Sequence, residues 1–318
     1  MQPSIRTVGV VGTGVIGASW TALFLSRGLR VLVSDPAPDA KERLFAYLQQ
    51  SWPMLEKLGV HKNASISNCT FVGESLGDFY SEVDLIQENA PERPDLKRDL
   101  LALLDAKTKK EVVIASSSSG IPSSQFISEC QHPERVLIGH PFNPPHLMPL
   151  VEVVPHTGTN SQSVDIAMSF YKDMGKRPVL VKQECPGFVA NRLQAALATE
   201  AYSLVQRGIV SAEDCDVCVT TGVGLRWAFT GPFMTNVLGG GGGKDGFHQL
   251  MTHLGPGAQK WIEDMNAHAF KFSKEEIQKL DESVQKMLED TAVEDVQAQR
   301  DEALVELINR KKGSVALK

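Results

Sequence analysis

The sequence has little of what marks secreted, nucleic-acid-binding or membrane proteins. Its five cysteines among 318 residues form no framework of the kind that staples small secreted domains. Lysine and arginine number 32 against 38 aspartates and glutamates, and no basic block occurs, which argues against a nucleic-acid partner. No apolar run approaches the roughly 20 residues that a membrane span needs. Because the first predicted strand begins almost at once, we expect no leader peptide and a cytoplasmic, globular protein.

One cysteine pair has the spacing of a metal or redox motif, C-x-x-C at Cys215 and Cys218. No second pair and no histidine partner accompany it, and the acidic stretch before it is typical of a helix start. We therefore expect two ordinary thiols on a helix and no bound metal.

What the chain does have is an apolar run over residues 8–17 that leads into the pattern G-x-G-x-x-G. Gly12 would permit a tight turn out of a strand, and Gly14 would let the backbone approach a pyrophosphate. Gly17 would let the following helix pack closely on the strand. Apolar residues then recur at helical spacing. The pattern predicts a dinucleotide-binding turn.

The residues around this turn favour NAD over NADP. Val15 and Ile16 open the following helix, whose N-terminus would hold the pyrophosphate. Asp35 ends the next apolar strand, where a carboxylate can accept both ribose hydroxyls and would repel a 2′-phosphate. Residues 36–38 read Pro-Ala-Pro, so no adjacent arginine would hold that phosphate. The alternative is a glycine turn and a surface aspartate unrelated to any cofactor.

Strand and helix patterns alternate over residues 1–186 and predict an α/β fold, a Rossmann-type doubly wound, mainly parallel sheet. This region includes a short helix expected over residues 122–130. Residues 187–318 show almost only helical patterning and predict an all-helical C-terminal domain. The glycine run at residues 239–243 follows no strand and lacks a P-loop lysine–serine pair, so we expect a turn between helices.

Three polar residues stand where a hydride-transfer site would need them. His140 ends a buried strand, and ligands of doubly wound sheets bind at the carboxyl ends of strands. Glu152 interrupts an apolar strand, where a carboxylate is costly unless it is paired, and could fix the tautomer of such a histidine. Ser119 lies in a four-serine loop after another strand. Structural roles remain open for all three, since a lone histidine or a serine turn is often only structural.

Five segments together resemble the 3-hydroxyacyl-CoA dehydrogenase superfamily, and the resemblance spans nearly the whole chain. These segments are residues 10–17, 115–121, 139–144, 149–153 and 186–192. A closer resemblance, to the λ-crystallin and L-gulonate 3-dehydrogenase branch, lies in residues 140–145, 149–156 and 224–232. The helical tail beyond Phe270 also resembles that branch and the related carnitine dehydrogenases.

The resemblance implies roles for individual residues. It makes His140 the general base, Glu152 its partner, and Ser119 a ligand of the reacting oxygen and of the cofactor. Asn191 would orient the substrate. The family implies substrate stereochemistry on the L (S) side and a homodimer built through the helical domain.

Further cofactor and substrate contacts follow from the same resemblance. Glu92 and Lys97 match positions beside the nicotinamide half and its ribose, and Asn143 is expected to contact the cofactor. Arg226 would pair with the carboxylate of a free-acid substrate, because a guanidinium fork matches a carboxylate bidentately. A plain helix-surface arginine is an equal alternative.

Three functions remain open at this point. The first is an NAD-dependent oxidation of the 3-hydroxyl group of a small free acid, of the L-gulonate 3-dehydrogenase type. The second is a short-chain L-3-hydroxyacyl-CoA dehydrogenase. A long acyl-CoA is less expected, because the serine loop and the prolines at 141 and 145 depart from the acyl-CoA pattern. The third is a non-catalytic NAD-binding protein like the crystallins.

Overall fold

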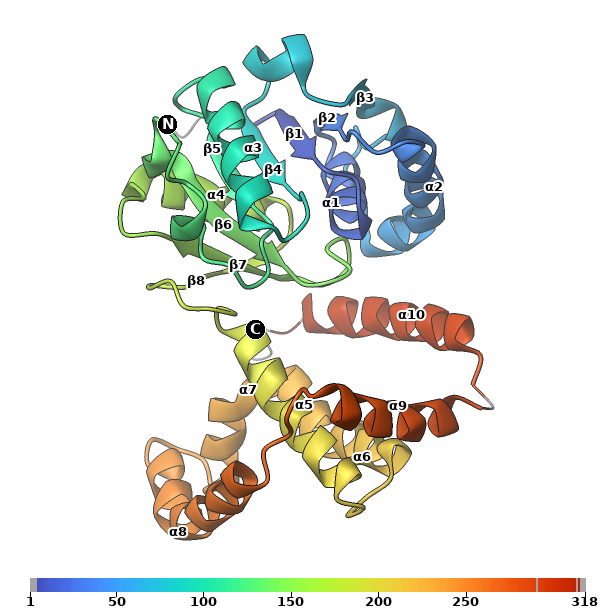
Figure 1. The fold of residues 1–318 in the computed structure, drawn as a ribbon, viewed down its shortest axis with the longest axis vertical. Helices are drawn as coiled ribbons and strands as arrows, with labels where there is room; N and C mark the ends of the chain where they lie inside the picture. The colour runs from blue at the N-terminus through green and yellow to red at the C-terminus, as the bar shows by residue number, and fades with distance from the viewer. Residues whose placement is uncertain (1–4, 290, 313, 315–318) are drawn as a thin grey trace. The chain divides into compact units, whose positions relative to one another are not determined.

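A computed structural model of the chain describes residues 5–289, 291–312 and 314 (Figure 1). The chain divides into two compact units, Met1–Arg192 and Leu193–Lys318. The division falls after Arg192, whereas the sequence placed it after residue 186. None of the described helices is both long enough and apolar enough to span a bilayer.

The first unit is built on one eight-stranded sheet in the order β3-β2-β1-β4-β5-β6-β7-β8. Neighbouring strands run parallel except β6 and β7, which pair antiparallel. The order reverses at β1, so β1 and β4 flank the switch point where doubly wound sheets bind ligands. The strands are β1 (Thr7–Val11), β2 (Arg30–Ser34), β3 (Cys69–Gly73), β4 (Leu85–Glu88), β5 (Val113–Ser116), β6 (Val136–Pro141), β7 (Leu150–Pro155) and β8 (Arg177–Leu180).

Helices cover both faces of this sheet, and their buried residues form two apolar clusters. One cluster joins α1, α2 and α4 to the sheet and includes the stacked rings of Trp20 and Phe24 of α1. The other joins α3 to the opposite face. The four helices are α1 (Val15–Ser26), α2 (Ala40–Leu58), α3 (Pro94–Lys107) and α4 (Ser161–Asp173). This arrangement confirms the predicted Rossmann-type fold.

The short helix expected over residues 122–130 was wrong. Only a 3₁₀ turn, Ser123–Gln125, forms there. The Ser123 hydroxyl and the Ser124 N–H both bond Glu184 Oε1, at 2.9 and 3.1 Å. These serines therefore use their polar groups outside a helical ladder, which is why such residues favour turns.

The second unit is all helical within the described residues, as predicted. Its helices are α5 (Ala190–Gln206), α6 (Ala212–Cys218), α7 (Gly224–Gly239), α8 (Gly246–Ala267), α9 (Lys274–Leu288) and α10 (Val293–Lys312). A π-helical turn, Val219–Val223, joins α6 to α7, and α7 kinks at Gly231, just before Pro232. The glycine run after α7 forms the expected turn into α8.

The two cysteines of the C-x-x-C pair lie on α6 as free thiols. Among the described residues, no group of histidine, cysteine and acidic side chains could hold a metal ion.

Candidate functional site

The glycine turn between β1 and α1 has the shape that a dinucleotide needs. Gly12 has φ +91°, a left-handed conformation that glycine adopts without steric cost. A Cβ at Gly17 would lie 1.9 Å from the Gly12 carbonyl oxygen, so only glycine lets α1 approach the turn this closely. A Cβ at Gly14, by contrast, would meet no atom within 4 Å. Gly14 therefore faces open space into which a ligand can come.

The first turn of α1 is free to bind an anion. Gly14 is its N-cap and no side chain caps the turn by a hydrogen bond. Val15 is 61% exposed and Ile16 half-buried, although both are apolar residues that open α1. An uncapped helix N-terminus offers N–H groups and the positive end of the helix dipole to a phosphate. The described residues thus fit the pyrophosphate of NAD.

Asp35 lies at the end of β2 and faces the glycine turn. Its Oδ2 accepts hydrogen bonds from the Thr13 backbone N–H at 2.6 Å and the Thr13 hydroxyl at 2.7 Å, and Oδ1 accepts from the Ala37 N–H. Burial would raise the pKa of Asp35, but these bonds and the charge of Arg43 lower it on balance. The carboxylate is therefore ionised at neutral pH. Arg43 lies on α2, so the residues that directly follow Asp35 in the sequence did not predict its charge near this carboxylate.

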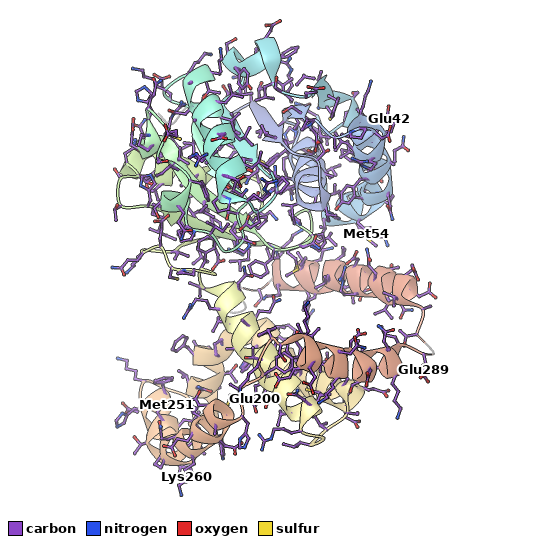
Figure 2. All side chains as sticks on the ribbon, in the orientation of Figure 1. Glu42, Met54, Glu200, Met251, Lys260 and Glu289 are labelled. Carbon is purple, nitrogen blue, oxygen red and sulfur yellow. The ribbon has the colours of Figure 1, made fainter. Side chains whose placement is uncertain are left out.

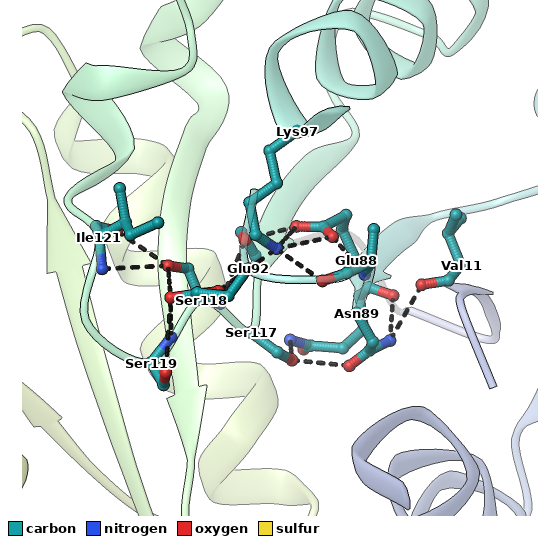
Figure 3. A network of polar contacts seen from close by, with 12 residues as sticks. Val11, Glu88, Asn89, Glu92, Lys97, Ser117, Ser118, Ser119 and Ile121 are labelled. Carbon is teal, nitrogen blue, oxygen red and sulfur yellow. Dashed lines mark hydrogen bonds and ion pairs between the residues drawn. The ribbon is translucent and has the colours of Figure 1, made fainter. Parts of the chain in front are cut away.

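Glu88 and Lys97 form a buried ion pair next to the switch point (Figure 3). Lys97 Nζ lies 3.0 and 3.1 Å from the two carboxylate oxygens of Glu88 and 3.0 Å from the Ala90 carbonyl oxygen. A fourth oxygen, Glu92 Oε2, lies 3.8 Å away. Since the Lys97 side chain is only 1% exposed, its charge acts mainly on Glu88 and Glu92.

Glu92 in turn shapes the serine loop, residues 117–120. Its Oε1 accepts hydrogen bonds from the Ser118 hydroxyl at 2.7 Å, the Ser119 N–H at 2.9 Å and the Gly120 N–H at 3.1 Å (Figure 3). Burial would raise the pKa of Glu92, but the Ser118 hydroxyl, the Lys97 charge and the two N–H groups lower it overall. The loop is thus fixed by a carboxylate, while Ser119 stays exposed at its tip.

A chain of buried polar side chains underlies this edge of the sheet. The Tyr171 hydroxyl donates to Gln87 Oε1 at 2.7 Å, and Gln87 Nε2 donates to Ser117 Oγ at 2.8 Å. Ser117 Oγ also accepts from Trp20 Nε1 and donates to Asn89 Oδ1. Sequence reasoning did not single out these residues. The available signal was the polar end of the otherwise apolar strand at residues 85–89.

His140 and Glu152 face each other across the antiparallel pair β6 and β7. His140 Nδ1 lies 2.9 Å from Glu152 Oε2, and both side chains are almost fully buried. Burial would raise the pKa of Glu152, but the bond to His140 and the backbone N–H groups of Ala190 and Val189 hold it below its usual value. Glu152 is therefore a carboxylate at neutral pH, which places the imidazole proton on Nδ1 and leaves Nε2 to accept another.

Asn191 and Asn143 lie on two different segments of this region. Asn191 Nδ2 donates to the Ser119 carbonyl oxygen at 2.5 Å, which ties the start of α5 to the serine loop. Asn143 is exposed on the loop that follows His140. Buried Lys176 anchors that loop, because its Nζ donates to the carbonyl oxygens of residues 145 and 148.

Arg226 belongs to the second unit. It lies on α7, exposed, and its guanidinium has no hydrogen-bond or ion-pair partner among the described residues. It is thus available to an anionic ligand.

Two family models match consecutive parts of the chain. The model of the 3-hydroxyacyl-CoA dehydrogenase NAD binding domain matches residues 7–185. The model of the 3-hydroxyacyl-CoA dehydrogenase C-terminal domain matches residues 187–281.

Known proteins resemble the chain over nearly its full length. A 3-hydroxyacyl-CoA dehydrogenase of Gibberella moniliformis is 54% identical over 98% of this chain and 96% of its own. An L-carnitine dehydrogenase of Streptomyces coelicolor is 42% identical over 96% of this chain and 94% of its own. The crystal structure of an NAD⁺-dependent dismutase, 5-formyl-3-hydroxy-2-methylpyridine 4-carboxylic acid 5-dehydrogenase, superposes with a TM-score of 0.78 and 29% identity, covering 98% and 99% of the two chains.

These matches agree with the glycine turn, the acidic residue after β2 and the buried histidine–glutamate pair. The chain belongs to the 3-hydroxyacyl-CoA dehydrogenase family of NAD-dependent oxidoreductases.

Proposed function

We propose that the protein reversibly oxidises the 3-hydroxyl group of a small free hydroxy acid, of the type handled by L-gulonate 3-dehydrogenase. The observation that carries this proposal is the buried pair of His140 and Glu152 at the ligand-binding edge of the sheet. A base with a neutral nitrogen and a fixed anionic partner is what removal of a hydroxyl proton requires.

NAD, when bound, supplies the hydride acceptor. His140 Nε2 takes the hydroxyl proton as C3 of the substrate loses hydride, so that the alcohol becomes a ketone. Glu152 keeps the imidazole oriented and stabilises its positive charge once it is protonated. The exposed Ser119 hydroxyl hydrogen-bonds the reacting oxygen, and Asn191, held against the same loop, orients the substrate.

Glycine-turn residues, Asp35 and Asn143 hold the cofactor in this scheme. Glu92 and Lys97 act beside its nicotinamide half, Glu92 by fixing the serine loop and Lys97 by holding Glu92. Arg226 binds the substrate carboxylate.

Several relatives favour a free acid, because carnitine carries both a 3-hydroxyl group and a free carboxylate. L-carnitine dehydrogenases of Nocardiopsis dassonvillei and Streptomyces coelicolor are 47% and 42% identical to this chain. A 3-hydroxyacyl-CoA thioester is the second candidate, since the relative at 54% identity is named a 3-hydroxyacyl-CoA dehydrogenase.

The test is formation of NADH, followed at 340 nm, with free acids (L-gulonate, 3-hydroxybutyrate, L-carnitine) and with 3-hydroxybutyryl-CoA and longer thioesters. We expect turnover of a free acid, a strong rise in its KM in Arg226→Ala, and no change in Arg300→Ala, a control on α10. Turnover of thioesters alone would establish the second candidate. NAD binding without turnover of either set would support the non-catalytic, crystallin-like alternative.

We also propose that two copies assemble as a homodimer through the helical unit, and that the protein acts in the cytoplasm. Exposed apolar side chains on α7 and α8 support the first statement: Phe233 is 75% exposed and Trp261 is 64% exposed.

A further inference from the structure

Residues 185–191, which we term the linker turn, form hydrogen bonds with the serine loop and with the carboxylate of Glu152. The Gly187 N–H donates to the Gly120 carbonyl oxygen at 3.1 Å. The N–H groups of Val189 and Ala190 both donate to Glu152 Oε1, at 2.9 and 3.0 Å. The same carboxylate holds His140 through Oε2. The Glu152 carboxylate therefore links the backbone of the linker turn to His140, the proposed base.

Phe188 stands at the centre of the linker turn and has an unusual backbone. Its φ is +48°, and Asp39 is the one other non-glycine residue with positive φ in the described part of the chain. A left-handed backbone is unfavourable for any residue with a Cβ. Phe188 also donates its N–H to the Cys185 carbonyl oxygen at 3.1 Å. Something other than local preference must keep this residue in place.

The ring of Phe188 supplies that constraint. It is fully buried and packs in the apolar cluster of the α3 face. Its centroid lies 5.6 Å from that of the His140 imidazole, with the planes at 55°. A second ring, Phe142, lies 5.0 Å from the imidazole. Because Phe142 is only half-buried, Phe188 is the more firmly held of the two neighbours.

We propose that Phe188 is a positioning residue for the general base. Its buried ring fixes the plane of the His140 imidazole, and its left-handed backbone aims two N–H groups at Glu152. Loss of either function loosens the hydrogen bond between His140 and Glu152. The role assigned to His140 rests on the proposed function, whereas the positioning of the pair by Phe188 does not.

Four variants separate this role from simple packing. Phe188→Leu keeps apolar volume but removes the flat ring, and Phe126→Leu is the control, because Phe126 is fully buried in the same cluster. Phe188→Gly and Phe188→Ala both remove the ring, but glycine adopts positive φ without strain whereas alanine does not. Packing alone predicts that alanine, being larger, is the better replacement. Backbone positioning predicts the opposite order.

The measurements are kcat, NAD affinity, and the proton NMR signal of His140 Nδ1–H, assigned by its loss in His140→Ala. In Phe188→Leu we expect kcat to fall by about tenfold or more, since small misplacements of catalytic groups are costly, with NAD affinity unchanged. The Nδ1 proton should exchange faster with solvent than in Phe126→Leu. We expect kcat of the glycine variant to exceed that of the alanine variant by about fivefold or more.

Equal kcat and equal proton exchange in Phe188→Leu and Phe126→Leu would overturn the proposal, as would a more active alanine variant. If the glycine and alanine variants do not fold, the leucine pair decides alone. A wild-type protein that turns over no substrate would count against the proposed function only. The exchange rate of the Nδ1 proton would still test the role of Phe188.

Discussion

The first unit encloses charged side chains together with their partners, whereas the second leaves large apolar side chains at its surface. In the first, Glu88 with Lys97 and Arg135 with Asp105 are ion pairs with almost no exposed side-chain surface. Each such charge would be costly without its partner. These four buried charged side chains therefore find their partners within the first unit.

The helical unit buries few apolar side chains and exposes many large ones. Among its described residues, the buried apolar ones are Cys215, Phe270 and Val305. Met251, labelled on α8 in Figure 2, is exposed, as are other apolar residues of α7 and α8. Exposed apolar side chains of this size support the proposed association through the helical unit. The comparison fits the proposal that the acid–base pair belongs to the first unit and that copies associate through the second.

The largest expected effect is at His140, the proposed general base. His140→Ala should lower kcat by about 10²–10⁴-fold, the usual contribution of general base catalysis, and leave NAD affinity unchanged. His156→Ala is the matched control, because His156 is buried in the same unit but its ring bonds only backbone groups. Steady-state kinetics at 340 nm and an NAD titration measure both quantities. Loss of NAD affinity in His140→Ala alone would show that the site is laid out differently.

Association is the next effect in size. Light scattering should give the wild-type protein about twice its chain mass of 34.7 kDa. Replacing Phe233 and Trp261 together by aspartate should raise the dimer dissociation constant by about 30-fold or more, as expected for central interface residues. Lys260→Asp, on α8 but polar, should change it little. A monomeric wild type would contradict the comparison.

Substitution of two glycines tests whether the glycine turn between β1 and α1 packs and binds NAD as described. Gly17→Ala would force a Cβ onto the Gly12 carbonyl oxygen, so we expect a loss of about 1–3 kcal/mol in the free energy of unfolding. Gly14→Ala has open space around its Cβ and should keep its stability. It should weaken NAD binding by about tenfold, ~1.4 kcal/mol, because the methyl group would meet the cofactor. Equal stability of the two variants would contradict this account of the turn.

The last effect, seen only as a change with pH, concerns a charge that the first unit buries at a cost. Burial, and then the charge of Arg27, lowers the pKa of Lys176 from 10.5 to about 7. Between these values the folded protein binds fewer protons than the unfolded chain, so stability rises with pH over this window. In urea unfolding, the free energy of unfolding of the wild type should rise relative to that of Lys176→Met between about pH 6.5 and about pH 9.5. Lys172→Met, exposed on α4, controls for charge removal, and parallel pH curves for wild type and Lys176→Met would refute the shift.

The sequence predicted the features that local patterns record. The glycine turn, the alternation of strands and helices, and the cost of Glu152 in an apolar strand can all be read from neighbouring residues. The partner of Glu152 followed from the same reasoning, because a buried carboxylate needs one.

Other features depend on contacts between distant segments. Glu92 caps the serine loop only because the connections after β4 and β5 lie side by side, and Arg43 reaches Asp35 only through the path of α2. The left-handed backbone of Phe188 has no sequence signal, since phenylalanine avoids it. The first compact unit extends to Arg192, six residues beyond the boundary expected after residue 186, because residues of the linker turn bond to Gly120 and Glu152 of that unit.

This last point limits how the protein can be cut and recombined. Glu152 receives two of its hydrogen bonds from Val189 and Ala190, which lie beyond the end of the matched NAD-binding region at residue 185. A fragment that stops there would keep the whole sheet but leave a buried carboxylate half satisfied. A chimaera meant to exchange the helical unit while retaining the hydrogen-bonded pair of His140 and Glu152 must therefore carry the parent sequence at least through Ala190.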